Sequence, residues 1–369
     1  PNYDKFPSTV IAGTIFQGWD EIRGVLSDCL KSNNVLAVDC YTGVYEEELV
    51  RELSKLSARL VLVRDLYKEE SELRCMTERF MTEDVLFGYV TNLCISDYFD
   101  VEKLEDARRC ACGVSTPLII IGTGAGIVAP GATLVYVDMA RWEIQQRCRR
   151  HEVKALGIDN REDAVSLQYK RGYFNDWRIC DRYKSTLFEH VDYWLDSHIP
   201  GSPKMIDRET FYKGINKTAS KPFRVVPYFD QAPWGGQWMK EVCDLDSDVP
   251  NYGWCFDCVP EENSLYLEVN GVRFELPSIN LVLLKSKELL GEPVEARFGK
   301  EFPIRFDFLD TMGGGNLSLQ VHPTTQFIHE NFGMFYTQDE SYYLLDAEED
   351  AVVYLGVRNG TDSKEMIEE

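Results

Sequence analysis

Asn316–Pro323 reads Asn-Leu-Ser-Leu-Gln-Val-His-Pro, and Asp339–Ala347 reads Asp-Glu-Ser-Tyr-Tyr-Leu-Leu-Asp-Ala. The first stretch alternates, so on a β-strand the side chains of Gln320 and His322 point to one face of the sheet. Glu340 opens the second stretch and can reach the same point from a neighbouring strand. A lone histidine is more often an ordinary polar group, but an imidazole, an amide oxygen and a carboxylate together suit zinc or a similar divalent ion. The pattern therefore predicts a metal site on short strands.

This region resembles the metal site of type I mannose-6-phosphate isomerases, which are cupins. The resemblance rests on Leu-Ser-Leu-Gln-Val-His-Pro, on a glutamate that opens a strand ending Leu-Asp-Ala, and on Tyr354–Gly356, and it extends back through Phe302–Asp310 to Trp234–Gly236. It implies an all-β cupin or jelly-roll domain that holds zinc through the same three side chains. It also implies a metal-dependent isomerisation between mannose 6-phosphate and fructose 6-phosphate, in which a proton moves between C1 and C2.

The resemblance further implies where a sugar phosphate would bind. Trp234 could stack on the sugar, Lys240 could contact the phosphate, and Ser318 is a third candidate contact. Trp234 is equally well explained as a core residue at the seam between two domains. The sequence does not identify a catalytic acid or base.

The chain departs from that family at several positions. The family's fourth zinc ligand is a histidine on a later strand, whereas the last histidine here is His329. Asp307 and Gln338 stand where the family has lysines, and the chain ends soon after Gly356, before the part that supplies the catalytic arginine. Two explanations stay open: the N-terminal part of a longer protein, or a short protein with a divergent site. The alternative function is a non-catalytic module that binds a sugar or sugar phosphate.

Residues 1–198 alternate short apolar strands with helices, and this pattern is typical of a parallel sheet covered by helices on both faces. The expected strands are Val35–Asp39, Arg59–Val63, Pro117–Gly122 and Ala132–Asp138. The fold class predicted is therefore an α/β domain over residues 1–198, a linker over 199–223, and a cupin domain over 224–369 whose jelly roll is complete only if the chain continues. Within the last, Ser264–Leu276 has two alternating arms about Asn270-Gly271, which is a strong hairpin signal, and Ala351–Gly356 reads as another strand.

In the α/β half, the first function to consider is phosphate binding by a loop that follows a strand. A working P-loop needs a Gly-rich turn, a lysine and a Ser or Thr, but Val35–Asp39 is followed by a turn that leads into Glu46–Glu48. Those acids are better explained as complementing a helix dipole. This half resembles degenerate uridine-kinase-type P-loop folds and is not expected to bind nucleotide. Gly122–Gly126 reads Gly-Thr-Gly-Ala-Gly, lacks the last glycine of the dinucleotide fingerprint, and is interpreted as a turn.

Residues 169–184 interleave basic side chains with aromatic rings. Such a mixture can bind phosphate, here through Arg178 or Arg182. The alternative is an amphipathic helix that packs its rings inward and leaves Arg178, Arg182 and Lys184 in solvent.

Composition narrows the class of protein. The 369 residues carry a net charge of -22, which argues against nucleic acid as a partner because a phosphate backbone would be repelled. The 11 cysteines are an odd number and favour reduced thiols in the cytoplasm. Cys255-Phe-Asp-Cys258 and Cys110-Ala-Cys112 lack a second pair at zinc-ribbon spacing. No apolar run reaches the length of a membrane span.

Overall fold

A seven-stranded sheet dominates the computed structural model, which describes residues 3–368. In order across the sheet the strands are β2 (Ile15–Gln17), β8 (Lys204–Asp207), β7 (Tyr193–Asp196), β6 (Thr133–Asp138), β3 (Val35–Cys40), β5 (Leu118–Ile121) and β4 (Arg59–Leu62). The five strands from β7 to β4 are parallel, and β8 and β2 are added antiparallel at one edge. The first strand of the parallel set, β3, therefore lies in the middle, between β5 and β6.

The central strands are apolar because both of their faces are covered. Every residue of β3 and β5 is buried, as expected for a parallel sheet between two layers. The strands predicted for this half are confirmed within one or two residues at each end. The antiparallel edge departs from the expected all-parallel sheet because β8 returns after a connection of only a few residues, too short for a parallel crossover. Residues 199–223, expected as a linker, thus hold β8 and the helix Arg208–Ala219.

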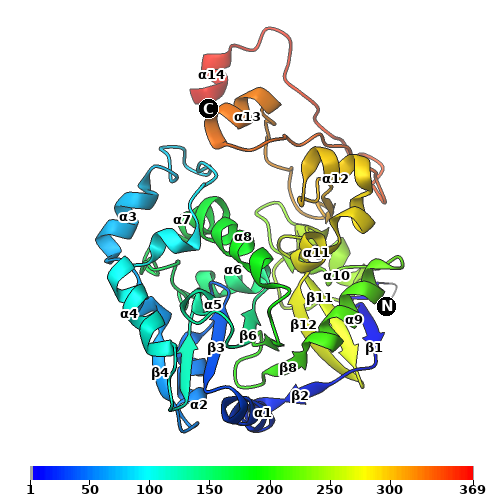
Figure 1. Cartoon of the computed structure of the whole chain (residues 1–369). Coiled ribbons are helices and arrows are strands. Elements are labelled where there is room, and N and C mark those ends of the chain that lie inside the picture. The colour runs from blue at the N-terminus through cyan, green and yellow to red at the C-terminus, as the bar shows by residue number, and fades with distance from the viewer. Residues whose placement is uncertain (1–2, 369) are drawn as a thin grey trace.

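Along the chain, the helices of this first unit lie between its successive strands, and the last of them follows β8 (Figure 1). They are α1 (Gly18–Ser32), α2 (Glu46–Leu53), α3 (Glu70–Glu78), α4 (Val101–Ala111), α5 (Ala125–Val128), α6 (Arg141–Arg149), α7 (Val165–Arg171), α8 (Trp177–Leu187) and α9 (Arg208–Ala219). Asp100 begins α4, because its carboxylate accepts hydrogen bonds from the free backbone N–H groups of Glu102 and Lys103. A π-helical turn at Gly172–Asp176 joins α7 to α8. Single 3-10 turns lie at Val63–Leu66 and Ile95–Tyr98.

Two smaller sheets complete the fold. One contains β1 (Ser8–Ile11), β11 (Ser264–Val269) and β12 (Val272–Pro277), and the other β9 (Tyr228–Asp230), β10 (Trp254–Cys258) and β13 (Phe306–Leu309). The remaining helices are α10 (Trp238–Val242), α11 (Ile279–Leu290), α12 (Glu292–Phe298), α13 (Thr325–Phe332) and α14 (Ser363–Glu368). Leu267, Phe274 and Leu276 belong to the same hydrophobic core as the central strands, so the β11–β12 hairpin is packed onto the α/β unit.

The last part of the chain has little regular structure. Figure 1 shows it as long loops with α13 and α14, at the end of the molecule opposite α1. The strands predicted at 316–323, 339–347 and 351–356 are not formed in the described residues. A strand needs a neighbour to pair its backbone groups, and no neighbour runs beside these segments there. Their apolar side chains consequently stay in solvent, and Leu355 is 98% exposed. The jelly roll therefore stays a prediction.

The predicted hairpin is confirmed, and it supports a test of backbone strain. Asn270 and Gly271 both have positive φ, +53° and +81°, as a two-residue type I′ turn requires. We expect Gly271→Ala to lower the free energy of unfolding by about 1 kcal/mol. Gly24→Ala is the matched control, because a Cβ at this position in α1 meets nothing within 4 Å; it should raise stability by roughly 0.5–1 kcal/mol. Urea titrations should show a lower free energy of unfolding for Gly271→Ala and a higher one for Gly24→Ala. Equal effects of the two substitutions would contradict the assignment of the turn.

No helix among residues 3–368 combines the length and the apolar character that a membrane crossing needs.

Candidate functional site

Aspartates close three neighbouring strands at the carboxyl edge of the large sheet. Asp39 is the last residue but one of β3, Asp138 ends β6 and Asp196 ends β7. In open α/β sheets ligands bind at this edge, where the strand order reverses, which here is between β3 and β6. All three carboxylates are buried. The geometry of this edge therefore decides whether the unit can hold a ligand.

Side chains from α8 fill the crevice between β3 and β6. Lys184 is fully buried, its Nζ lies 3.2 Å from Asp138 Oδ1, and it also sits 4.7 Å above the centre of the Tyr41 ring. Asp181 accepts a hydrogen bond of 2.9 Å from the Tyr41 hydroxyl and pairs with Arg141. The crevice is thus occupied by a paired, fully packed polar network. The expectation that Lys184 is solvated is wrong, because its ammonium group neutralises a buried carboxylate.

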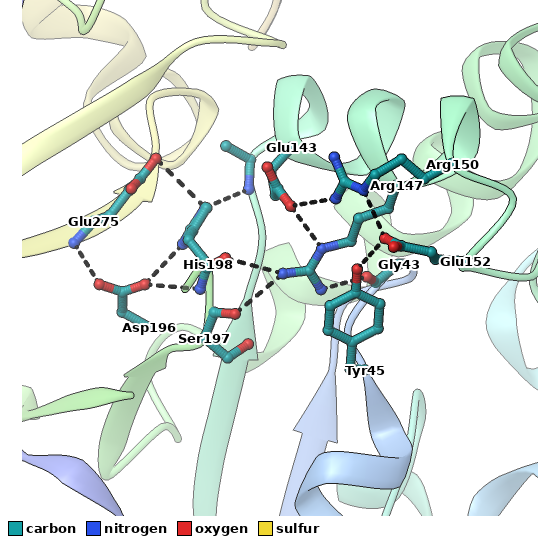
Figure 2. Close-up of polar contacts among 11 residues, drawn as sticks. Gly43, Tyr45, Glu143, Arg147, Arg150, Glu152, Asp196, Ser197, His198 and Glu275 are labelled. Carbon is teal, nitrogen blue, oxygen red and sulfur yellow. Dashed lines mark hydrogen bonds and ion pairs between the residues drawn. The ribbon is translucent and has the colours of Figure 1, made fainter. Parts of the chain in front are cut away.

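Arg147 of α6 occupies the position beside the turn that follows β3 (Figure 2). Its side chain is fully buried, and its guanidinium donates to the carbonyl oxygens of Gly43 (3.0 Å), Ser197 (3.1 Å) and His198 (3.2 Å). A phosphate-binding loop points backbone N–H groups at its ligand, whereas this turn points a carbonyl at a cation. The guanidinium also lies 3.8 Å from the centre of the Tyr45 ring. The polarity of this turn is therefore opposite to that of a P-loop.

The second candidate anion site, Gly122–Gly126, is occupied by the chain itself. Asp39 accepts hydrogen bonds from the N–H groups of Gly124 (3.0 Å) and Gly126 (2.9 Å) and from the hydroxyl of Tyr183 (2.6 Å). Burial raises the pKa of Asp39 to about 6, against these three hydrogen bonds. The loop does bind an anion, but the anion is this carboxylate, so the interpretation as a structural turn is supported.

Asp196 and His198 form the second half of the cluster drawn in Figure 2. Asp196 accepts from His198 Nδ1 (2.8 Å), from Lys204 Nζ (3.1 Å) and from the N–H of Glu275 on β12 (3.0 Å). Burial acts to raise the pKa of Asp196, but these donors outweigh it and lower the pKa to about 2. The aspartate therefore ties the large sheet to the β11–β12 hairpin.

The tautomer of His198 follows from its two partners. The N–H of Ala140 donates to Nε2 at 3.0 Å, so the ring proton is on Nδ1 and points at Asp196. Burial lowers the pKa of His198, whereas the carboxylates of Glu275 and Asp196 act to raise it, to about 9. The Ala140 hydrogen bond opposes that gain, because a charged imidazole has no lone pair on Nε2. The ring is thus held between the Ala140 N–H at Nε2 and the Asp196 carboxylate at Nδ1, with Glu275 3.8 Å from Nε2.

Two of the three predicted metal ligands meet. His322 Nε2 lies 3.1 Å from Glu340 Oε2, and two ligands of one zinc ion at ordinary bond lengths stand roughly 3–3.5 Å apart. Gln320 lies two residues earlier and is exposed, and no contact in the described residues joins it to the pair. The same residues hold no group of three or more His, Cys, Asp or Glu placed for a metal ion. The contact is an ion pair at a distance that a shared metal ion would also allow, and the set of three ligands remains a prediction.

Asp307 of β13 lies near this pair. Burial and then the negative charge of Glu340 raise the pKa of Asp307 to about 6. Asp307 stands where the resembling family has a lysine, so the neighbourhood of Glu340 gains a carboxylate and loses a cation. This change favours a metal ion over an anionic ligand at the His322–Glu340 pair.

The predicted substrate contacts do not converge on that pair. Trp234 is buried and packs edge-on against Trp254, 5.1 Å between ring centres. Lys240 Nζ donates to the carbonyl oxygens of Ser247 (3.4 Å) and Pro250 (3.2 Å), so its charge serves a local loop. Ser318 is exposed in an irregular segment. Of the two explanations for Trp234, the core position is the one that the structure supports.

Glycines next to Trp234 allow a close packing of two loops. A Cβ on Gly236 would lie 2.1 Å from Asp310 Oδ1, and one on Gly314 would lie 2.3 Å from the Trp234 carbonyl oxygen. The N–H of Gly315 donates to that same carbonyl at 3.0 Å. The resemblance in Trp234–Gly236 thus corresponds to a tight contact with the loop that leads toward the candidate metal residues.

The cysteines show no redox pair. All 11 are free thiols, and burial raises the pKa of Cys255 to about 12 and that of Cys258 to about 11. A raised pKa lowers the thiolate fraction on which disulfide exchange depends. Cys255 and Cys258 are therefore best explained as structural thiols.

Sequence reasoning missed Arg147, Asp196 and His198 as a cluster. One available signal was that an aspartate closes each of three apolar strands, because the carboxyl ends of parallel strands meet at one edge. Nothing in the basic stretch 141–150 distinguishes the two arginines that are buried, Arg141 and Arg147, from the exposed ones.

Fold and site together define a class: an α/β unit with an occupied ligand crevice, followed by smaller sheets and a C-terminal pair of candidate metal ligands. The chain belongs to the family described as a domain of unknown function, DUF8485, whose sequence model matches residues 18–220. That match runs from the start of α1 to the end of α9, and so covers the α/β unit including β8. No curated protein matches the chain, and no solved structure does.

Proposed function

We propose that the chain is a mannose-6-phosphate isomerase-like protein of the cytoplasm, a metal-dependent aldose–ketose isomerase for mannose 6-phosphate and fructose 6-phosphate. The observation that carries the proposal is the 3.1 Å contact between His322 Nε2 and Glu340 Oε2. These side chains come from the two segments that resemble the isomerase motif, and they are separated by 18 positions. A shared metal ion requires two such side chains to lie this close.

His322, Glu340 and Gln320 are the residues that would hold the metal. Zinc or a similar divalent ion polarises sugar oxygens and so makes the neighbouring carbon acid easier to deprotonate. The chain's own contribution is to place an imidazole and a carboxylate together, with Asp307 as a further carboxylate nearby whose raised pKa of about 6 makes it able to exchange a proton near neutral pH.

The α/β unit has a supporting role in this proposal. Arg147 and Lys184 fill its ligand crevice, and the turn after β3 offers a carbonyl where a P-loop offers N–H groups. We infer that this unit is a non-catalytic relative of nucleotide-kinase folds. A calorimetric titration with ATP and UTP should accordingly show no heat of binding.

Metal content and turnover test the proposal directly. We expect the purified chain to bind about one equivalent of zinc by elemental analysis and to convert mannose 6-phosphate in a coupled assay. His322→Ala should lose the metal and at least about 100-fold of the turnover, because two protein ligands hold zinc poorly. His329→Ala is the control: His329 is exposed on α13 and faces Phe335 rather than Glu340. A metal-free chain without turnover in added zinc would reject isomerase activity.

The second candidate function is a non-catalytic module that binds sugar phosphate and has lost turnover. The exposed, irregular segments around His322 and Glu340 favour it, because a catalytic site needs ligands held rigidly. Affinity for mannose 6-phosphate without any conversion would support this function over the first.

A further inference from the structure

A cleft lies where α8 meets the C-terminal region and includes Arg178, one of the two arginines named above for phosphate contact. Its enclosed space is about 40 Å³, and the cleft opens to solvent. Its polar and aromatic lining consists of Tyr173, Arg178, Glu261, Glu301, Arg305 and Tyr336. Two arginines, Arg178 and Arg305, are in this lining and are the candidates for contact with a phosphate group.

Two arginines reach this cleft from different parts of the chain. Arg178 Nη1 lies 3.2 Å from Glu301 Oε1, and Arg305 Nη2 lies 2.7 Å from Glu261 Oε1. Among the four residues of these two ion pairs, Glu301 is the most exposed, with 40% of its side chain in solvent. A partly exposed ion pair is weak, whereas a phosphate can accept two parallel hydrogen bonds from one guanidinium. A phosphate group can therefore take the place of Glu301 on Arg178.

The π-helical turn at Gly172–Asp176 orients Arg178 in the cleft. The Arg178 Nε–H donates to the Tyr173 carbonyl oxygen at 3.2 Å, and its guanidinium carbon lies 4.9 Å from the centre of the Tyr173 ring. An extra residue in a helix rotates the side chains that follow it, and such turns occur frequently at functional sites. Here the turn brings Tyr173 and Arg178 to the same cleft, where the guanidinium contacts Tyr173 on one side and Glu301 on the other.

Glu261 adds a requirement for a hydrogen-bond donor. Its Oε1 is paired with Arg305, whereas its Oε2 is buried and has no hydrogen-bond partner among the described residues. A buried carboxylate oxygen without a donor is costly, and a ligand hydroxyl supplies one. Tyr336 offers an aromatic ring on which the apolar face of a sugar can pack, whereas the Tyr173 ring already contacts the Arg178 guanidinium and Tyr169. The combined chemistry is that of a phosphate attached to a polyhydroxy group.

We propose that this cleft binds a small phosphorylated, hydroxyl-bearing ligand of the sugar phosphate class. Arg178 and Arg305 hold the phosphate, and Glu261 accepts from a hydroxyl. The inference rests on the proposed function for the choice of sugar, whereas the phosphate contacts stand on the geometry of the cleft. It requires neither a metal nor turnover, so it can fail or succeed separately from the isomerase proposal.

Calorimetric titration of the metal-free full chain, with EDTA present, tests the cleft using inorganic phosphate and mannose 6-phosphate as probes. We expect both to bind. Arg178→Gln and Arg305→Gln should each weaken phosphate binding on the order of tenfold or more, because each removes a charge-assisted contact. Glu301→Gln should strengthen it several-fold, because the variant frees Arg178 and removes a negative charge. A purely structural role for these ion pairs predicts no gain from that variant.

Arg297→Gln provides the matched control, with the same change of charge at an exposed position of α12 outside the cleft. It should leave affinity unchanged. Glu261→Gln should weaken mannose 6-phosphate relative to inorganic phosphate, because only the sugar has hydroxyl groups that lie away from its phosphate group. Far-UV circular dichroism checks that each variant is folded. If one of the two arginine variants does not fold, the phosphate affinity of the other one tests the proposal. Absent phosphate binding, or equal binding by the wild type and both arginine variants, overturns the proposal even if the chain proves to be an active isomerase.

Discussion

Arg147→Ala should lower the free energy of unfolding by about 3–5 kcal/mol. The substitution removes a fully buried guanidinium that donates to three carbonyl oxygens and to Glu143, 2.9 Å from Arg147 Nε. Those acceptors belong to the turn after β3, to the end of β7 and to α6 itself, so three elements lose their common donor. A buried acceptor left without a partner costs about 1–3 kcal/mol, and loss of one member of a buried ion pair costs a similar or larger amount.

The measurement is urea-induced unfolding followed by circular dichroism. Arg150→Ala is the control, because Arg150 lies one turn along the same helix with 48% of its side chain exposed and pairs with Glu143 and Glu152. Surface pairs of this kind contribute 0–1 kcal/mol. Arg147→Lys should fall between the two, because one ammonium group cannot reach all the carbonyls that a guanidinium bridges. If Arg147→Ala were as stable as Arg150→Ala, the cluster would not hold the carboxyl edge together.

Asp196→Asn should destabilise the protein by about 2–4 kcal/mol at pH 7, and the loss should shrink in acid. The ordinary pKa of an aspartate is 3.8, and in the fold that of Asp196 is lowered to about 2. A pKa lowered by folding means that the ionised group stabilises the native state at pH values above the unfolded pKa. That difference corresponds to about 2 kcal/mol, which is fully present at pH 5 and above and falls to about half by pH 3.

The free energy of unfolding of wild type and Asp196→Asn, measured between pH 7 and pH 3, checks both the size of the stability loss and the direction of its change with pH. The gap between wild type and Asp196→Asn should narrow as the pH falls. Asp28→Asn supplies the control, because Asp28 is 76% exposed and pairs only with Lys31 on the surface; its effect should stay below about 0.5 kcal/mol at each pH. A gap for Asp196→Asn that widened in acid would contradict the lowered pKa.

The large sheet was predictable because burial on both faces demands long apolar runs. Val35–Cys40 and Leu118–Ile121 carry such runs, and the breaks between them mark the helices. The hairpin at Asn270-Gly271 was predictable for a different reason, since only a few residues accept positive φ at two successive positions. The edge strand β8 was not predictable, because the Pro and Gly residues before it are equally typical of a linker.

The candidate site was predictable only in part. His322 and Glu340 were brought together by a motif, yet their strands did not form, because alternation gives a strand its faces but not the neighbour that it must pair with. Arg147 and Lys184 escaped prediction because basic residues on a helix are usually solvated. Their burial depends on carboxylates and carbonyl oxygens that come from strands elsewhere in the chain.

From the sequence alone we predicted the strands of the α/β unit, the absence of a working P-loop lysine, the hairpin, and the candidate metal ligands. Each of these depends on local pattern or on residue type. The folded structure was needed to show that Arg147 and Lys184 fill the crevice, that Asp39 occupies the Gly122–Gly126 loop, and that Arg178 and Arg305 share a cleft. The reason is physical: which charges lose their water depends on contacts between residues far apart in the chain, and those contacts exist only once the sheets have packed.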